Sequence, residues 1–318
     1  MITLSKLAKL AHVSVSTVSK AFSMSNEVNE QTRELIFKLA REHGCFKKYY
    51  NAKYPKFVVA VICPEFRGRY YSHYMAIIQE QLAKHNIELC VATTDFSPEN
   101  ERNLLEYYNN YSSVDAIINI NGQVDSLGFD VPIISINPAK NVTQCVLETN
   151  AYNAFRSVIE HFYNHKITDI GFIGELRTMS KLNQFKEIMT EVTGNFNERF
   201  LITTDKRFEE GGYDAMSRLI ESGNIPRAVI CAYDYMAIGS IRCALDKGLK
   251  IPEDIAVVGM NNIPECEYLN PTLATIASDT NQLCINAVEM VVSILEGTEY
   301  KLTDQPESKF ILRKSAEI

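Results

Sequence analysis

The sequence predicts a small all-α head followed by a larger α/β body, and three observations lead to this fold class. Residues 3–44 contain three segments whose apolar residues recur at helical spacing. From Phe57 onward, short β-rich apolar runs alternate with amphipathic helical segments, the pattern of βαβ units on parallel sheets. The charge also divides, because residues 1–56 carry a net charge of +6 and the remaining 262 residues carry −13.

The first two predicted helices form a helix-turn-helix in the stretch TLSKLAKLAHVSVSTVSKAF, residues 3–22. Thr3 is a suitable N-cap for the first helix, and Ser14 for the second, since a hydroxyl can accept from an unpaired backbone N–H. His12 lies where the tight turn needs a left-handed backbone, which His tolerates. The exposed side chains of the second helix are short, polar or basic: Val15, Ser16, Thr17, Ser19 and Lys20. Such a helix suits the major groove of DNA, although a solvated helical hairpin is the alternative.

A third helix is predicted at residues 30–43, with Asn29 as its N-cap and Gly44 as its left-handed stop. Its inward residues are expected to be Leu35, Leu39 and Ala40. The three helices would close one small domain, residues 1–44. A basic head on an acidic body is the asymmetry expected when only the head meets phosphate.

The head closely resembles that of the lac-repressor-like (LacI/GalR) transcription regulators. The residues that match the family pattern are Ala8, Ala11, Val13, Ser14, Thr17, Val18, Ser19, Val28, Thr32 and Arg33. Lys20 replaces the usual Arg, Lys6 the usual Asp and Asn29 the usual Ser. The resemblance implies that Val15, Ser16 and Lys20 reach base edges. It also implies that a second group holds phosphates or helix ends: Thr3, Ser14, Thr17, Ser19 and Asn29.

Residues 45–56 form a polar, basic and aromatic connector, which is predicted to be the hinge between head and body. In the resembled family this segment folds on DNA into a helix whose Leu wedges into the minor groove. Here the wedge position falls on Pro55, after the pair Ala52 and Lys53, and the segment is shorter than usual. An ordinary linker is therefore one alternative. The other is groove contact by an aromatic residue: Tyr49, Tyr50 or Tyr54.

The body, residues 57–318, is predicted to hold two doubly wound parallel sheets in tandem. Strands are expected at 57–65, 87–95, 114–121, 131–137, 169–175, 199–205, 228–234 and 255–262. Helices are expected at 73–86, 100–111, 153–167, 179–192, 211–223 and 235–248. The pattern suggests a bilobed, periplasmic-binding-protein-like body with a cleft at the strand C-termini.

The body also resembles the same family along its length, in blocks such as VPIISIN, AVICAYDYMAIG and IPEDIAVVGMNN. The topology of the family implies a head-proximal lobe at about 57–148 and 279–301. The distal lobe would then comprise about 149–278 and 302–318. No cofactor is implied.

The resemblance also implies a small-molecule effector, a sugar or a related metabolite, in the cleft between the lobes. Lys181 falls where relatives carry an Arg, and it supplies a point charge without the planar fork. Asn261 replaces the usual Asp, and it can donate as well as accept. The other lining candidates are Tyr70, Tyr71, Asn153, Phe208, Tyr233, Asp234 and Thr280. The alternative is that Lys181 and Asn261 are ordinary surface and turn residues and that no typical effector binds.

Several other classes of protein are disfavoured. The N-terminus becomes a polar helix with no signal peptide, and no run approaches the ~20 apolar residues of a membrane span, so we expect a cytoplasmic protein. The eight cysteines include no C-x-x-C pair, which favours free thiols over a metal site.

An enzyme or a ligand-binding protein without effector-controlled DNA binding is the rival class. No nucleotide-binding or hydrolase motif is present, although Asp95 and Asp234 could be imagined as acid–base groups. His161 and His165 have a spacing that permits a metal, but capping of a helix end is favoured. The sequence therefore predicts a DNA-binding transcription regulator, a repressor acting as a homodimer on a near-palindromic operator in double-stranded DNA.

Overall fold

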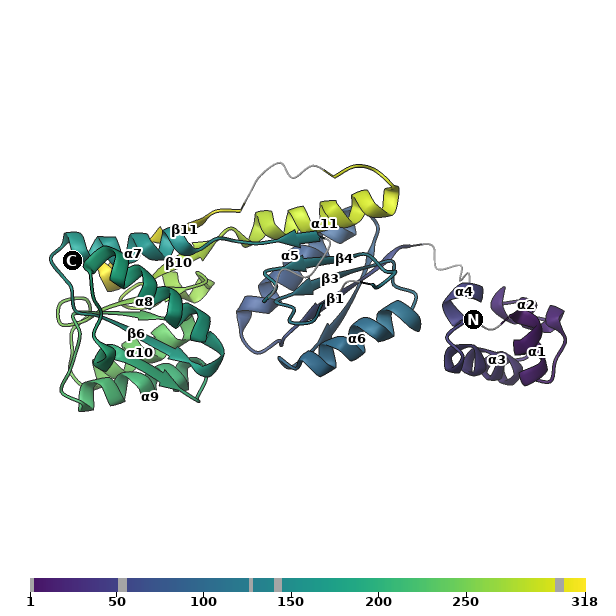
Figure 1. Ribbon diagram of the computed structural model, residues 1–318, viewed down its shortest axis with the longest axis horizontal. Helices are drawn as coiled ribbons and strands as arrows, with labels where there is room; N and C mark the ends of the chain where they lie inside the picture. The colour runs from purple at the N-terminus through teal and green to yellow at the C-terminus, as the bar shows by residue number, and fades with distance from the viewer. Residues whose placement is uncertain (1–2, 51–55, 126–127, 140–144, 301–305) are drawn as a thin grey trace. The chain divides into compact units, whose positions relative to one another are not determined.

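The computed structural model divides the chain into two compact units (Figure 1). It describes residues 3–50, 56–125, 128–139, 145–300 and 306–318. Unit 1 comprises Met1–Glu148 and Asn281–Asp304, and unit 2 comprises Thr149–Thr280 and Gln305–Ile318. The chain thus crosses between the two units three times: from the first to the second, back to the first, and again to the second. No described helix has the length and apolar character that a membrane span needs.

The head is a cluster of four short helices within unit 1: α1 (Leu4–Leu10), α2 (Val15–Phe22), α3 (Glu30–Glu42) and α4 (Phe46–Tyr49). The three predicted N-caps are confirmed, since Thr3, Ser14 and Asn29 accept from the backbone N–H of Lys6, Thr17 and Thr32. His12 has the expected positive φ, 54°. The inward face of α3 was predicted wrongly at one position. Leu35 is 44% exposed, whereas Ile36 is fully buried.

The head core continues beyond Gly44, so the predicted end of the head at residue 44 is too early. Cys45 and Phe46 are buried with the residues of α1, α2 and α3. The rings of Phe46 and Tyr50 stack with centroids 4.6 Å apart, and Tyr49 lies 5.8 Å from Phe22. Tyr49 and Tyr50 therefore complete the head core rather than standing free for a DNA groove. The expected hinge residues Ala52, Lys53, Tyr54 and Pro55 lie outside the described residues.

Unit 1 also holds a five-stranded parallel sheet in the order β2-β1-β3-β4-β5. Its strands are β1 (Val58–Cys63), β2 (Glu88–Thr93), β3 (Ala116–Ile120), β4 (Ile133–Ile136) and β5 (Cys145–Leu147). Side chains alternate between its faces. Val59 and Ile118 pack with α5 (Arg69–Lys84) and α11 (Thr280–Glu296), whereas Ile62 and Ile117 pack with α6 (Pro98–Asn110). Figure 1 shows these helices on opposite faces of the sheet.

Unit 2 holds a six-stranded sheet in the order β11-β10-β9-β8-β6-β7. Its strands are β6 (Ile170–Glu175), β7 (Leu201–Thr204), β8 (Ala228–Cys231), β9 (Ala256–Met260), β10 (Ala274–Ser278) and β11 (Ser308–Ile311). All neighbours are parallel except β11, which runs antiparallel to β10. The helices are α7 (Tyr152–Asn164), α8 (Met179–Thr193), α9 (Phe208–Glu221) and α10 (Asp234–Asp246). The predicted fold class, a helical head with a two-sheet α/β body, is confirmed.

Two glycines let α9 and α10 pack backbone against backbone on unit 2. A Cβ atom on Gly212 would lie 1.9 Å from the carbonyl oxygen of Met236. A Cβ atom on Gly239 would lie 1.9 Å from the carbonyl oxygen of Glu209. Because neither backbone can retreat without moving a helix, glycine is required at both positions.

Candidate functional site

The predicted DNA-binding residues all lie on or next to the N-terminal parts of α1, α2 and α3, or along α2. Ser14 caps α2 through the N–H of Thr17 at 3.0 Å and shares hydrogen bonds with the hydroxyls of Ser16 and Thr17 at 2.9 and 2.8 Å. Val15, Ser16, Ser19 and Lys20 are exposed, and Thr17 is partly buried. Val18 and Ala21 face the head core. The second helix thus has an outer face of mostly short, polar side chains, and the Ser14 hydroxyl caps its first turn.

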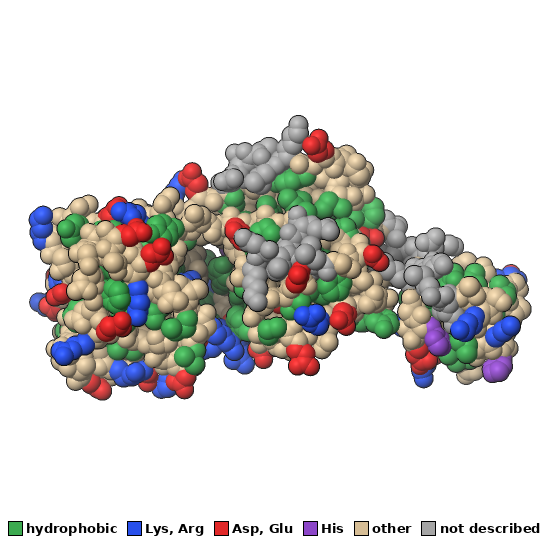
Figure 2. Space-filling model, in the orientation of Figure 1, with side chains coloured by type: hydrophobic (Ala, Val, Ile, Leu, Met, Phe, Trp, Pro, Cys, Tyr) green, Lys and Arg blue, Asp and Glu red, His purple; other side chains and the backbone are tan. Residues whose placement is uncertain are grey.

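The basic residue of this face has a partner inside the head. The ammonium group of Lys20 forms an ion pair with the carboxylate of Glu27, from the turn between α2 and α3. Figure 2 shows basic and histidine side chains on the head beside a group of acidic ones. The acidic partner was not anticipated from the sequence, although Glu27 is the first acidic residue of the chain.

In unit 2, a polar cluster gathers where β6 and β8 end. Lys181, on α8, donates from Nζ to the carbonyl oxygen of Ala232 at 2.7 Å, just after β8. Burial lowers the pKa of Lys181 from 10.5 to about 8, although the carboxylates of Asp234 and Glu175 oppose the shift. Burial of an ammonium group is costly, so this lysine is a candidate for a functional role.

A second part of the cluster centres on Glu175, the last residue of β6. Its buried carboxylate lies 3.2 Å from Nε of Arg207 and accepts from the hydroxyl of Tyr233 at 3.2 Å. The same hydroxyl accepts from the backbone N–H of Phe208 at 2.9 Å, and burial raises the pKa of Tyr233. Glu175 and Arg207 were missed by the sequence analysis. The available signal was a charged residue ending an otherwise apolar strand, GFIGE.

Asp234 was predicted to line the ligand site, but it has a structural role instead. It is fully buried, and its carboxylate accepts from the hydroxyl of Thr275 at 2.6 Å and from the N–H of Ile263 at 2.9 Å. Burial raises its pKa to about 6, although these hydrogen bonds oppose the shift. Asp234 therefore fastens the start of α10 to β10 and to the segment after β9.

The remaining predicted residues of unit 2 differ in their surroundings. Asn261 follows β9 with a φ of 101° and donates its N–H to the carbonyl of Ile276 at 2.8 Å. Phe208 begins α9 with a φ of 55°, and the Arg207 guanidinium lies 4.6 Å from its ring centroid. Asn153 is exposed on α7. The Thr280 hydroxyl donates to the carbonyl of Ser278 at 3.4 Å. Lys181, Phe208 and Tyr233 are thus brought together around Glu175. Asn153 and Thr280 lie on other elements, α7 and the start of α11.

In unit 1, the two predicted tyrosines are part of the packing of α5 rather than free stacking platforms. Tyr71 is only 7% exposed, and its hydroxyl accepts from Nδ2 of Asn121 at 2.9 Å. Tyr70 is partly buried, and its hydroxyl lies 3.2 Å from that of Tyr74. Burial raises the pKa of both Tyr70 and Tyr71. Tyr71, which was expected to line the ligand site, is therefore mostly buried in the packing of α5.

The two histidines considered as metal ligands bind backbone groups. Nε2 of His161 lies 3.1 Å from the carbonyl oxygen of Ala316, and Nδ1 of His165 lies 2.7 Å from that of His161. Within the described parts of the chain, no three His, Cys, Asp or Glu side chains form a group suited to a metal ion. His165 is the C-cap residue of α7, so its contact with the carbonyl of His161 agrees with the predicted capping of the helix end, whereas His161 contacts the C-terminal segment.

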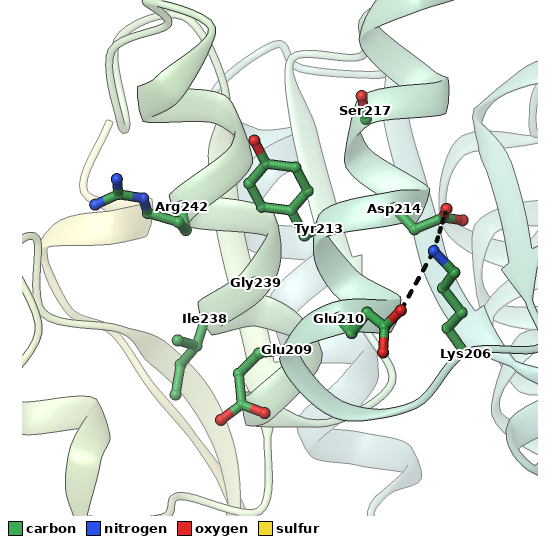
Figure 3. Close-up of a pocket in the computed structure, with 9 residues that line it drawn as sticks. All are labelled: Lys206, Glu209, Glu210, Tyr213, Asp214, Ser217, Ile238, Gly239 and Arg242. Carbon is green, nitrogen blue, oxygen red and sulfur yellow. Dashed lines mark ion pairs between the residues drawn. The ribbon is translucent and has the colours of Figure 1, made fainter.

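A hollow of about 590 Å³ lies on unit 2 between α9 and α10 (Figure 3). No feature of the sequence pointed to this hollow. Lys206 forms ion pairs there with Glu210 at 3.4 Å and Asp214 at 3.2 Å. The lining residues are Lys206, Glu209, Glu210, Tyr213, Asp214, Ser217, Ile238, Gly239 and Arg242. Its charged groups are largely paired with one another, and none of the predicted effector residues lines it.

Two family models match the chain. Residues 3–45 match that of the bacterial regulatory proteins, lacI family, and residues 159–316 match a periplasmic binding protein-like domain. The chain is 25% identical to the transcriptional repressor PurR of Pasteurella multocida, over 99% of this chain and 98% of that protein. It is 22% identical to the transcriptional regulator AscG of Escherichia coli, with the same coverage. Both relatives are transcriptional regulators and not enzymes, in agreement with the class of protein that the sequence predicts.

Solved structures share the fold along the whole chain. The lac repressor dimer bound to operator and an anti-inducer matches with a TM-score of 0.74 and 18% identity, over 99% of both chains. The complex of the regulator CelR with cellobiose matches with a TM-score of 0.70 and 21% identity, over 99% of this chain and 100% of that one.

Proposed function

Because the chain belongs to the lacI family of bacterial regulatory proteins and is a DNA-binding transcriptional regulator, we propose that it is a cytoplasmic repressor whose DNA affinity is set by a small-molecule effector. The main structural support for DNA binding is the outer face of α2. This face is capped by Ser14 and presents Val15, Ser16 and Lys20 to solvent. A helix with short side chains and one long cation is suited to the major groove.

Each residue of this face has a distinct role in the proposal. Val15 makes apolar contact with a thymine methyl group, Ser16 donates to or accepts from a base edge, and Lys20 donates to guanine. Thr3, Ser14 and Asn29 cap three helices, and helix N-termini favour phosphate. Thr17 and Ser19 add hydroxyl groups beside them. Substitution of a base-edge residue should therefore change sequence preference, whereas substitution of a phosphate-binding residue should weaken binding to all sequences.

The proposed effector site is the polar cluster of unit 2. Lys181 donates to a carbonyl, and Arg207 and Tyr233 satisfy Glu175, so the polar groups present are bonded to one another. A ligand rich in hydroxyl groups, such as a sugar, could replace these bonds one for one. A strongly charged ligand would instead leave a buried charge unpaired. Asn261, which both donates and accepts, suits the same class. The solved structure of the regulator CelR is a complex with cellobiose, which supports a carbohydrate as the first class of ligand to test.

We propose that the protein acts as a homodimer. Two identical heads that read adjacent major grooves would bind a near-palindromic operator, whose symmetry matches that of the dimer. Sedimentation of the full chain with a duplex chosen from a random pool tests this. Two chains per duplex and a sequence with two inverted half-sites are expected. One chain per duplex, or a sequence without symmetry, would reject the dimer.

The effector part is tested by a thermal-shift screen of the full chain against sugars, phosphosugars and nucleosides. A ligand that binds only the folded protein raises the melting temperature with concentration. DNA titrations with and without the best ligand then measure coupling, which is typically about 5–150-fold. Identical DNA affinities in both titrations would refute control by that ligand. Turnover of the ligand would favour catalysis instead.

A further inference from the structure

The cation of the DNA-reading face is paired with an acid that also faces solvent. Lys20 and Glu27 form an ion pair, and their side chains are 45% and 68% exposed. Ser16 and Lys20 are four residues apart on α2, so they share one face of the helix. Glu27 therefore stands beside the surface that the proposed function assigns to base contacts.

The backbone of the turn that carries Glu27 is held close to α2 by hydrogen bonds on both sides of that residue. Nη2 of Arg33 donates to the carbonyls of Ser25 and Val28 at 2.8 and 2.9 Å. The N–H of Ser25 also donates to the carbonyl of Lys20 itself, at 3.0 Å. Arg33 is buried. A DNA duplex that docks on α2 at Lys20 therefore meets the carboxylate of Glu27 as well as the ammonium group.

A lysine paired with a glutamate favours a different group on DNA from the group that a lone lysine favours. A lone ammonium group is attracted to any phosphate. A carboxylate beside it repels phosphate and requires a hydrogen-bond donor. In the major groove, a G·C pair presents the guanine acceptors N7 and O6 and the cytosine N4 amino donor. That edge offers acceptors to Lys20 and a donor to Glu27.

We propose that Lys20 and Glu27 read one G·C base pair together, with Lys20 donating to guanine and Glu27 accepting from cytosine N4. Glu27 is thus a specificity-determining residue, and it reduces the attraction of Lys20 to phosphate on other DNA. This inference rests on the proposal that α2 reads bases.

The test uses the full chain and its variants Lys20→Ala, Glu27→Ala and the double substitution. A pool of duplexes with a randomised core first identifies the sequence that the unsubstituted protein prefers. Each base pair of that sequence is then changed in turn, and the affinity of every variant is measured. Glu34→Ala is the matched control, since it removes an equal charge from an exposed position of the same head.

Glu27→Ala and Lys20→Ala should lose the preference for G·C at the same base pair, a loss of about 5- to 150-fold. The double variant should lose no more there than Lys20→Ala, because the two side chains act as a unit. With a duplex of unrelated sequence, Glu27→Ala should bind more tightly. Its plot of log affinity against log salt should become steeper by about 0.9 as the freed lysine meets a phosphate. Glu34→Ala should keep the preference at every base pair.

Two results would overturn the inference. One is that Glu27→Ala changes affinity for all duplexes by the same factor, as Glu34→Ala should. The other is that Glu27→Ala and Lys20→Ala lose preference at different base pairs. If Lys20→Ala also keeps the full sequence preference, the assignment of α2 as the reading helix fails. If Lys20→Ala loses it and Glu27→Ala does not, only the role of Glu27 fails. Circular dichroism melts confirm that each variant folds.

Discussion

Replacing Lys181 by Met should make unit 2 more stable while weakening the proposed effector site. The ammonium group of Lys181 is held in a buried position by one carbonyl oxygen, that of Ala232. Burial lowers its pKa from 10.5 to about 8. Residues that serve binding often lower the stability of the folded protein. Lys181→Met should therefore raise the stability of unit 2 while it weakens ligand binding.

The magnitude follows from the pKa and the lost hydrogen bond. A difference between 10.5 and about 8 corresponds to roughly 3 kcal/mol of destabilisation while the lysine is charged. This is an upper limit, because the side chain keeps partial contact with solvent. The lost hydrogen bond from a charged donor offsets about 2 kcal/mol of it. Lys181→Met should therefore raise the free energy of unfolding by about 1 kcal/mol at neutral pH.

The pH dependence has a definite sign. Because the pKa of Lys181 is lower in the folded protein than in the unfolded chain, the unfolded chain binds more protons between about pH 8 and 10.5. The penalty is therefore fully present below pH 8 and is lost as the pH rises toward 10.5. The stability gained by Lys181→Met should be constant below pH 8 and shrink above it.

Far-ultraviolet circular dichroism with urea can follow the unfolding, since the chain contains no Trp. Hydrogen exchange of the β6 and β8 amides then assigns the change to unit 2, because a chain of several domains does not unfold in two states. Lys186→Met on the same helix is the control. Its ion pair with Glu198 at 3.0 Å is accessible to solvent, with side chains 31% and 70% exposed, so its loss should change stability by less than about 1 kcal/mol. A Lys181→Met protein less stable than the parent at pH 7 would refute the reasoning.

Three further substitutions test the roles given to a helix cap, a buried arginine and a glycine contact. Ser14→Ala removes the cap of α2 and should lower the stability of the head by about 1 kcal/mol, measured by thermal melts. It should also lower the affinity for DNA. Arg33→Ala removes the buried guanidinium donor from the carbonyls of Ser25 and Val28 and should cost about 2–4 kcal/mol; a melt unchanged from the parent would contradict this. Gly239→Ala sets a methyl group against the carbonyl of Glu209 and should cost about 3 kcal/mol, measured by urea unfolding; a cost below 1 kcal/mol would show that the helices separate freely.

The features predicted best from the sequence are those that depend on near neighbours in the chain. Thr3, Ser14 and Asn29 each cap a helix through an N–H only three residues ahead. A cap is therefore visible in a short window. The phase of α3 was harder, because Leu35, Ile36 and Phe37 are consecutive apolar residues, and periodicity alone does not choose which of them faces inward.

The errors concern groups whose partners are distant in the sequence. Asp234 follows a strand end, where ligand-binding residues are common, but Thr275 reaches it from β10. Phe46 and Tyr50 look like parts of a linker until Phe37 of α3 packs against them. A window of local sequence contains no information about such pairs. The sequence therefore pointed to only some residues of the polar cluster proposed as the effector site, and the Glu175–Arg207 pair was missed.

The same arrangement occurs at both candidate sites, because the groups suited to a partner are already bonded within the protein. Lys20 is paired with Glu27, Arg207 with Glu175, and Lys181 with a carbonyl. Binding at either site is then an exchange of hydrogen bonds, and only a partner that offers donors and acceptors in matching positions repays the bonds it breaks. A non-matching ligand or base pair leaves charged groups unpaired, which costs more than a missing contact. Pairing within the free protein therefore lowers affinity for all partners but lowers it most for the wrong ones.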